Sequence, residues 1–155
     1  MRDDSRSPPA AGGRTGPAGT AATATVRRVT PQDAARMRAL RLETLAGAPA
    51  GPRTAAGRLV GRAGGTVAPN DPGLTVIYAV YVTPSWRGTG LLAELIEGVA
   101  AWSRACGRPE LMPEVVVGND RAYRAYRRLG FVDTGVRVPH PKFPALRELQ
   151  MRRPA

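Results

Sequence analysis

Residues 79–92, AVYVTPSWRGTGLL, contain the part of the sequence that decides the fold. Ala79 to Val82 are typical of the end of a β-strand, and helically spaced apolar positions begin at Leu91. Between them, the glycines of the run Arg87-Gly88-Thr89-Gly90 let backbone N–H groups converge without Cβ obstruction. A helix N-terminus adds partial positive charge, and Arg87 adds a full one. The stretch therefore predicts a strand-to-helix turn that can hold a diphosphate.

A steric alternative stays open, because tight strand-to-helix turns also use glycine where no ligand is bound. The helix that follows is better determined. Its apolar residues recur at helical spacing, and Gly107 is placed as a C-terminal cap. The sequence predicts a helix of about five turns with one buried face, formed by Leu91, Leu92, Leu95, Ile96, Val99 and Trp102.

Upstream of this turn, the sequence predicts an antiparallel hairpin. Residues 58–67 and 74–82 have strand character, and Pro69 to Gly73 form a turn signal between them. Tyr78 and Tyr81 are three residues apart, so a regular strand would place them on opposite faces. Further upstream, Val26 to Val29 is a short strand candidate, and Thr30 to Asp33 predicts the start of a helix that runs to about Leu45.

Downstream of the long helix, strand and helix patterns continue to alternate. Residues 110–117 predict a strand and 120–129 a short helix that Gly130 ends. Residues 131–138 and 146–152 predict two further strands. The fold class is therefore α/β (α+β), with a mixed sheet that contains a parallel step in its middle.

Length and composition predict one ordered domain. The chain has 155 residues, and its Leu, Ile, Val and Phe residues all lie between Val26 and Leu149. Residues 1–25 are rich in Pro, Gly, Ser, Thr and Ala and show no periodicity, so we expect a disordered leader there. The predicted domain covers residues 26–153.

The formal net charge of +11 suits a polyanionic ligand, although a base composition that favours Arg, Ala, Gly and Pro codons explains it equally well. A nucleic-acid binder would gather its arginines in one stripe, whereas here they are scattered from Arg2 to Arg153. The longest apolar run, residues 76–82, is too short to span a bilayer. We therefore expect neither nucleic acid nor membrane as a partner.

The single cysteine, Cys106, cannot form an intramolecular disulfide, and the N-terminal residues contain no apolar signal stretch. These features favour a cytoplasmic location. His140 has no neighbouring His or Cys in the sequence, so we expect a loop residue there and no metal site.

The order of these elements and motifs resembles a known family. They resemble the acetyl-coenzyme A (acetyl-CoA) core of the GNAT superfamily of N-acetyltransferases. The resemblance lies in their order: a strand, Arg87-Gly88-Thr89-Gly90, a long helix, a second strand, Asn119, Tyr126 and finally Leu129-Gly130-Phe131. The resemblance covers roughly residues 26–153. It implies a mixed sheet whose fourth and fifth strands splay apart, with the pantetheine arm of acetyl-CoA in the gap.

The resemblance also implies which residues contact acetyl-CoA. Val80 and Val82 would offer main-chain hydrogen bonds to the arm, and Asn119 and Tyr126 would complete the cofactor site. The diphosphate would be held by Arg87, Gly88, Thr89, Gly90, Leu91 and Leu92. Leu92 departs from the family pattern, because a small residue usually stands at its position.

Tyr126 stands where relatives use a tyrosine to assist the departing thiolate. A phenol with a pKa of about 10 can hydrogen-bond or protonate a thiolate with a pKa of about 8.5. The structural alternative for Tyr126 is a helix tyrosine that packs on the sheet.

The amine must also lose a proton, so a base is expected. Many relatives carry a glutamate where this chain has Val76. Glu114 instead resembles the glutamate that ribosomal-protein alanine N-acetyltransferases place in their fifth strand, and it is the candidate base. Its structural alternative is a solvated surface carboxylate.

Two functions remain open on the sequence. The first is an N-acetyltransferase that acts on an amine of a small molecule or protein, as a monomer or a homodimer. The second is a catalytically degenerate acetyl-CoA binding module. The departure from the family pattern at Leu92 favours this second function. A short segment at residues 46–57 favours it too, because relatives usually carry a second helix and strand there at the front edge of the sheet.

Overall fold

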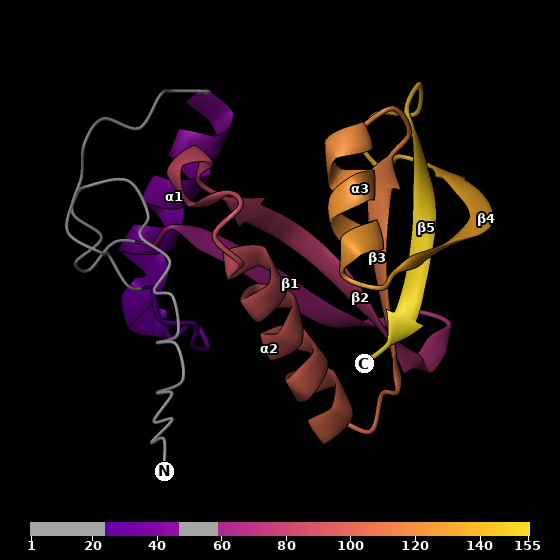
Figure 1. Ribbon diagram of the computed structural model, residues 1–155, viewed down its shortest axis with the longest axis horizontal. Coiled ribbons are helices and arrows are strands. Elements are labelled where there is room, and N and C mark those ends of the chain that lie inside the picture. Colours follow the sequence, from indigo (N-terminus) through magenta and orange to yellow (C-terminus); the bar gives the residue numbers. More distant parts are fainter. Residues whose placement is uncertain (1–23, 47–58) are drawn as a thin grey trace, which may run out of the picture.

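The computed structural model describes residues 24–46 and 59–155 (Figure 1). The predicted leader lies almost wholly outside the described residues, and so does the shortened segment at 46–57. A 3₁₀ turn, Pro31–Asp33, leads into α1. The elements are α1 (Ala34–Ala46), β1 (Gly61–Ala68), β2 (Asp71–Val82), α2 (Leu91–Ala105), β3 (Glu110–Val116), α3 (Asp120–Arg128), β4 (Val132–Pro139) and β5 (Arg147–Pro154).

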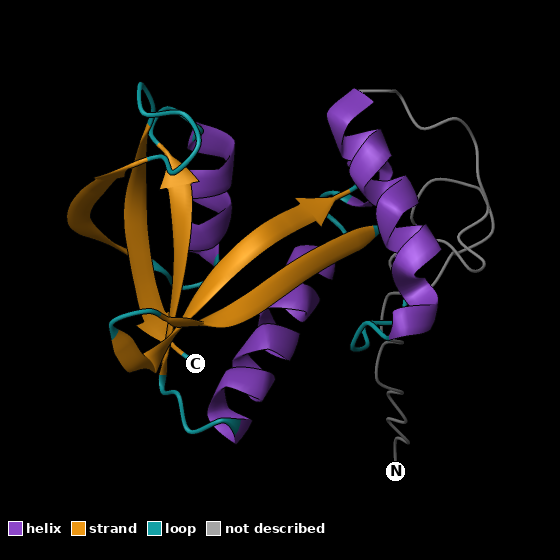
Figure 2. Ribbon diagram, turned by 180° about the vertical axis from the view of Figure 1, so that it is seen from behind, coloured by secondary structure: helices purple, strands orange, loops and turns teal. Residues whose placement is uncertain are grey.

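The described strands form one mixed sheet in the order β1-β2-β3-β5-β4, in which only β2 and β3 pair in parallel. Figure 1 shows α2 crossing the β1–β2 hairpin and α3 lying along β3. Both helices are on the same side of the sheet, because Val99 of α2 and Tyr126 of α3 share one core with Leu111 of β3. We call this side the front face. Figure 2 shows the opposite side, the rear face, where the strands are turned toward the viewer. The fold class predicted from the sequence is confirmed.

The two parallel strands separate along their length, as the family resemblance implies. β2 and β3 are paired only from Leu74 opposite Glu110 to Ile77 opposite Pro113. Two residues further on, Ala79 has a φ of 51°, which is unusual for a residue with a side chain. The register with β1 shifts at the same place. A β-bulge at Ala79 therefore bends β2 away from β3 and opens the sheet.

This bulge corrects the prediction for the two tyrosines of β2. Tyr81 is opposite Arg62 and Tyr78 is opposite Gly64. Arg62 and Gly64 are two residues apart on β1, so their side chains share a face, and cross-strand partners project from the same face. Tyr78 and Tyr81 therefore lie on one face, because the bulge inserts an extra residue between them.

The main core lies between the front face and the helices α2 and α3. Tyr126 and Phe131 contribute to it from the α3 region. The glycines of β1 let α2 pack closely, because a Cβ on Gly65 would lie 2.9 Å from Val99 Cγ1. The buried members of this core are Ile77, Ile96, Val99, Ala100, Leu111, Val115, Tyr126, Phe131, Leu149 and Met151.

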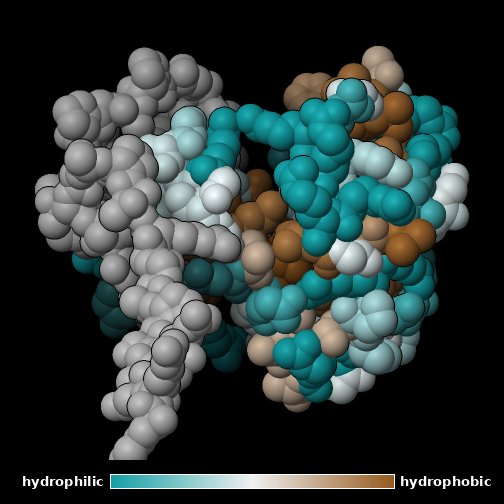
Figure 3. All heavy atoms as spheres, viewed as in Figure 1, coloured by the Kyte–Doolittle hydropathy of each residue, from teal (hydrophilic) through white to brown (hydrophobic). Residues whose placement is uncertain are grey.

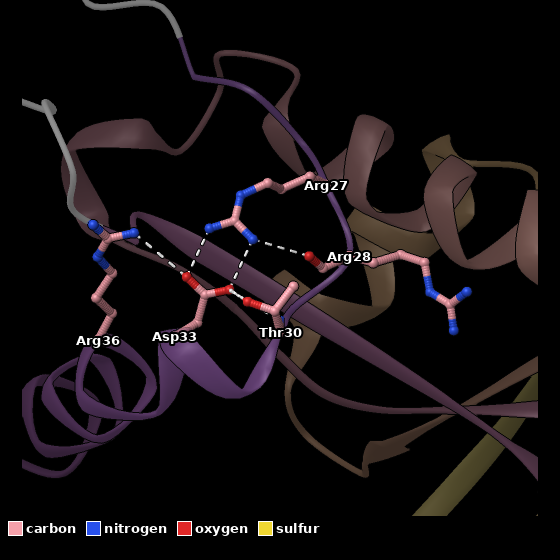
Figure 4. A network of polar contacts seen from close by, with 5 residues as sticks. All are labelled: Arg27, Arg28, Thr30, Asp33 and Arg36. Carbon is pink, nitrogen blue, oxygen red and sulfur yellow. Dashed lines mark hydrogen bonds and ion pairs between the residues drawn. The ribbon is translucent and has the colours of Figure 1, made fainter.

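The predicted strand at Val26 to Val29 is wrong, because these residues join no strand of the described sheet. Val26 instead lies near Gly98 of α2, and Val29 is 54% exposed. Arg27 is drawn to the start of α1, where its guanidinium holds the buried Asp33 carboxylate through contacts of 2.6 and 2.7 Å (Figure 4). Polar contacts therefore fix this segment without strand pairing.

Asp33 also completes the start of the first helix. Its Oδ2 accepts hydrogen bonds from the N–H (2.9 Å) and hydroxyl (3.1 Å) of Thr30, and Arg36 Nη1 lies 3.4 Å from Oδ1 (Figure 4). The capping pattern predicted at Thr30 to Asp33 is present. Hydrogen bonds from Arg27 and Thr30 hold the pKa of Asp33 well below its usual value.

The other boundaries differ from the predicted ones by a few residues. α2 has 15 residues, about four turns rather than five. The hairpin turns at Pro69 and Asn70, because Asp71 already pairs with Ala68. None of the helices in the described part of the chain is long and apolar enough to span a membrane.

Candidate functional site

The predicted diphosphate-binding turn, Arg87 to Gly90, lies between β2 and α2, and we call it the cradle. Gly88 has a φ of 78° and Gly90, the N-cap of α2, a φ of 93°. Nothing lies within 4 Å of the position that a Cβ would take on either glycine. The space beside both residues is therefore open, and their backbone conformation is one that other residues adopt only with strain.

The N–H groups of the cradle are available to a ligand. Those of Gly88, Thr89 and Gly90 have no acceptor in the described part of the chain. Those of the first turn of α2 lack partners within the helix, as at any helix start. Together with the helix dipole they form a site that suits an anion. These donors fit the diphosphate of acetyl-CoA, the ligand implied by the sequence resemblance.

Two side-chain contacts fix the shape of this turn. Arg87 Nε donates to the carbonyl of Val82 at 3.2 Å, and Thr89 Oγ1 donates to the carbonyl of Trp86 at 2.7 Å. Leu91 is buried, and Leu92 packs against the main core. Because its side chain points into the fold, the bulk of Leu92 does not stand in front of the N–H groups of the cradle.

The free edge of β2 runs directly into this cradle. Thr83 N–H donates to the carbonyl of Val60, so the backbone groups of Thr83 face β1. Backbone groups alternate in direction along a strand, so those of Val82 and Val80 face the gap between β2 and β3. The residues predicted to bind the pantetheine arm thus present main-chain groups at the unpaired edge.

Tyr126 lies on α3 and belongs to the main core. Its side chain is 7% exposed, and its ring meets Phe131 edge to face with centroids 5.4 Å apart. The hydroxyl has no hydrogen-bond partner within the described residues, and it is not among the unpaired polar atoms that are sealed from solvent. Burial of the ring raises the pKa of Tyr126 to about 12. The phenol is therefore protonated and free to donate at neutral pH.

The turn before α3 contains Asn119. Its side-chain oxygen accepts from the N–H of Ala122 at 3.2 Å and so caps the helix. The residue is exposed, and its amide group keeps free donors. A structural role for Asn119 is thus present, and the predicted cofactor contact is compatible with it.

Glu114 projects from β3 on the rear face, one residue beyond the last pair with β2. Its Oε1 accepts from Gln150 Nε2 at 3.0 Å. It is partly buried, so the alternative of a fully solvated carboxylate does not hold. The structure therefore separates the two predicted catalytic residues, with Tyr126 on the front side of the opened sheet and Glu114 on the rear side.

The structure adds Glu148, which the sequence argument missed, and places His140 beside it. Glu148 of β5 is opposite Val116 of β3, so it shares the rear face with Glu114. Its pKa is raised, chiefly by burial and further by Glu114, against the opposing effect of His140. His140 Nδ1 accepts the N–H groups of Lys142 and Phe143, so its proton lies on Nε2, 3.8 Å from Glu148. No local motif could have indicated this pair.

The surface agrees with a ligand channel on the front side. Figure 3 shows a hollow between the part of the molecule that contains α2 and the part that contains α3, with apolar residues at its floor.

Within residues 24–46 and 59–155, no group of three or more His, Cys, Asp or Glu side chains could hold a metal ion.

Comparisons with known proteins agree with this geometry. The model of the acetyltransferase (GNAT) family matches residues 27–131. The aminoglycoside N(6')-acetyltransferase type 1 of Stenotrophomonas maltophilia is 39% identical over 54 residues. That alignment covers 35% of this chain and 35% of the relative, so this chain matches about a third of the length of that protein.

Solved structures share the fold over most of the chain. The ribosomal-protein-S18-alanine N-acetyltransferase from Escherichia coli matches with a TM-score of 0.61 at 20% identity, over 84% of this chain and 92% of that one. A protein from Salmonella typhimurium, described as an acetyltransferase and solved with its cofactor acetyl-CoA, matches with a TM-score of 0.53 at 23% identity. That match covers 87% of this chain and 79% of the other.

Proposed function

Because this chain belongs to the GNAT acetyltransferase family, we propose that it is an N-acetyltransferase, which moves the acetyl group of acetyl-CoA to a primary amine of a small molecule or protein. One observation carries the proposal. The unpaired N–H groups of the cradle continue the free edge of β2, and Tyr126, whose hydroxyl is unpaired among the described residues, belongs to the core against which Val80 of that edge packs.

Acetyl-CoA fits the residues at this gap. The N–H groups from Gly88 to Leu92 would hold the diphosphate, with the guanidinium of Arg87 beside them. The main chain of Val80 and Val82 would pair with the pantetheine arm, and Asn119 would contact it from the start of α3. The bound thioester supplies an activated acetyl group, and no metal is needed for its transfer.

The transfer is a direct attack. The amine, after losing a proton from its ammonium form, attacks the thioester carbonyl. A C–N bond forms and the C–S bond breaks. The ammonium proton goes to solvent before the attack, and Glu114 accepts the second proton that nitrogen loses as the amide forms. The Tyr126 hydroxyl donates its proton to the departing sulfur and is reprotonated from solvent, to which Glu114 releases its own proton. The product is an N-acetyl amide and coenzyme A with a free thiol.

The second candidate function is an acetyl-CoA binding module without turnover. The contact between Gln150 and Glu114 favours this alternative. It occupies one oxygen of the carboxylate that would have to accept the amine proton. The two functions share the cradle and differ only in turnover.

Calorimetric titration of the full chain with acetyl-CoA tests both functions. Absence of binding at high micromolar concentration would contradict both. Where binding occurs, release of free thiol with a panel of amines separates them. We expect turnover in the wild type and a loss of about 10²-fold or more in kcat for Tyr126→Phe, with a much smaller loss of acetyl-CoA affinity. If acetyl-CoA binds but no amine releases thiol, the second function, a binding module without turnover, is supported.

A further inference from the structure

Arg62 of β1 is a half-buried arginine that has no partner in the described chain. Its Nε is sealed from solvent and makes no hydrogen bond. None of the ion pairs between described residues includes it; Arg152 of β5, by contrast, is paired with Glu110 at 2.9 Å. Buried donors in folded proteins are nearly always satisfied, and an unsatisfied one is a reason to look for an ion or ligand.

The sheet register places Arg62 on the rear face. Arg62 is opposite Tyr81, and cross-strand partners project from the same side. The ring of Tyr78 lies on this side too, because a Cβ added to the neighbouring Gly64 would come within 2.6 Å of it. Tyr78 is 53% exposed. An arginine and two tyrosines thus form one wall of the rear face.

The other wall lies across the gap in the sheet. Glu114 stands one residue beyond the last β2–β3 pair, and Tyr78 occupies the same position on β2. In parallel strands such neighbours share a face, so both project from the rear. Glu148 lies beside Glu114, and its Oε1 is 3.8 Å from Nε2 of His140. Carboxylates therefore face the arginine wall across the gap.

We propose that the acceptor amine also carries an anionic group, a carboxylate or a phosphate, which Arg62 binds on the rear face. This inference rests on the acetyl transfer proposed above. The amine would lie at the gap, near Glu114 and Glu148, where an ammonium is stabilised before it loses its proton. The guanidinium of Arg62 offers the planar donor pair that matches either anion.

The spacing of the strands limits the size of this acceptor. Arg62 and Glu114 are two strand intervals apart, about 10 Å, and Arg62 lies two residues, about 7 Å, further along the strands, because Gly64 is opposite Tyr78. Their backbones are therefore about 12 Å or more apart, which an extended peptide of three to four residues spans. A short peptide, or an amino sugar with a phosphate at its far end, therefore fits the distance. A polyamine would bring an ammonium next to Arg62, and the like charges would repel.

Paired ligands test the role of Arg62. Triglycine and triglycine amide share the reacting amine and differ in the carboxylate. Glucosamine 6-phosphate and glucosamine differ in the phosphate, and spermidine represents the polyamines. We expect kcat/KM to be about tenfold or more higher for the anionic member of at least one pair. The pair with the larger ratio identifies carboxylate or phosphate.

Variants connect this preference to one side chain. Arg62→Gln should bring the ratio of kcat/KM between the anionic and the neutral ligand close to one, by raising KM for the anionic ligand with kcat unchanged. Arg62→Lys should restore part of this ratio. Arg104→Gln, at an exposed arginine near the end of α2, is the matched control and should leave the ratio intact. Equal use of both pair members, or a preference for spermidine, would overturn the proposal while acetyl transfer stands.

Direct binding keeps the two proposals distinguishable. Calorimetry with triglycine and glucosamine 6-phosphate, on the protein with coenzyme A and without it, measures anion recognition in the absence of turnover. Weaker binding of at least one of these ligands to Arg62→Gln than to the wild type supports the anion site even if no acetyl transfer is found. Equal binding to the wild type and the variant would reject it.

Discussion

Tyr126 and Phe131 meet edge to face, with their rings 82° apart in orientation and their centroids separated by 5.4 Å. Phe131 N–H also donates to the carbonyl of Tyr126 at 3.1 Å. Arg153 lies over the Phe131 ring and donates to the carbonyl of Leu129. The end of α3, the loop after it and β5 thus hold the Tyr126 ring in place while its hydroxyl stays unpaired.

The first prediction concerns the ionisation of Tyr126. Burial raises the pKa of Tyr126 to about 12, so part of the tyrosinate absorbance should appear only as the pH approaches that value. The unfolded chain ionises near pH 10. The contribution of Tyr126 to stability is thus complete below about pH 10 and is lost as pH rises toward 12. In Tyr126→Phe the steep alkaline loss of unfolding free energy should shrink. An unchanged alkaline profile would contradict the assignment.

A second prediction concerns Gly90 in the cradle. Gly90→Ala would force a side chain into a left-handed conformation, at a cost of about 1–2 kcal/mol, although the Cβ itself meets no atom within 4 Å. If the loop relaxes to escape this strain, its N–H groups move. We expect acetyl-CoA affinity, measured by calorimetry, to fall about tenfold.

Gly135→Ala is the matched control for the cradle. Gly135 also has a positive φ, 81°, and an open Cβ position, but it lies in β4, away from the cradle. It should lose similar stability and keep the wild-type affinity. Equal affinity in both variants would show that the cradle geometry does not depend on Gly90.

The third prediction concerns the contact between β1 and α2. Gly65→Ala would place a Cβ 2.9 Å from Val99 Cγ1 and 3.0 Å from the Trp102 ring. Overpacking of this kind costs about 1–3 kcal/mol. Gly98→Ala, within α2, meets Val26 only at 3.6 Å and should stabilise the helix by about 0.5–1 kcal/mol. Urea unfolding of the two variants should therefore show shifts of opposite sign.

The fourth prediction concerns pH and the buried Asp33. The guanidinium of Arg27 and the N–H of Thr30 lower the pKa of this carboxyl. The stability it provides is present above the unfolded pKa of about 4 and is lost as pH falls below it. Asp33→Asn should therefore be less stable than the wild type at neutral pH, and the difference should narrow in acid. A stability difference that stays the same down to acid pH would contradict this role of Asp33.

Local chemistry made much of the fold and cradle predictable from the sequence. A strand that runs into Arg87-Gly88-Thr89-Gly90 and then into a regular apolar helix has few other conformations, because glycine permits the turn and the helix N-terminus fixes the donors. The position of Tyr126 before a glycine stop followed from the same kind of local pattern. The conformation of Val26 to Val29 could not be predicted, because the contact of Arg27 with Asp33 holds this segment and strand propensity does not.

The sequence by itself determined the order of the elements, the cradle and the candidate residues Tyr126 and Glu114. Only the tertiary structure decided how the rear face is composed. A single residue, Ala79 at a φ of 51°, puts Tyr78 and Tyr81 on one side. Strand register over long sequence separations brings Glu148 beside Glu114 and leaves Arg62 unpaired. Turns and helix starts are fixed by neighbouring residues, whereas the face and partner of a strand residue depend on a register that distant segments set together.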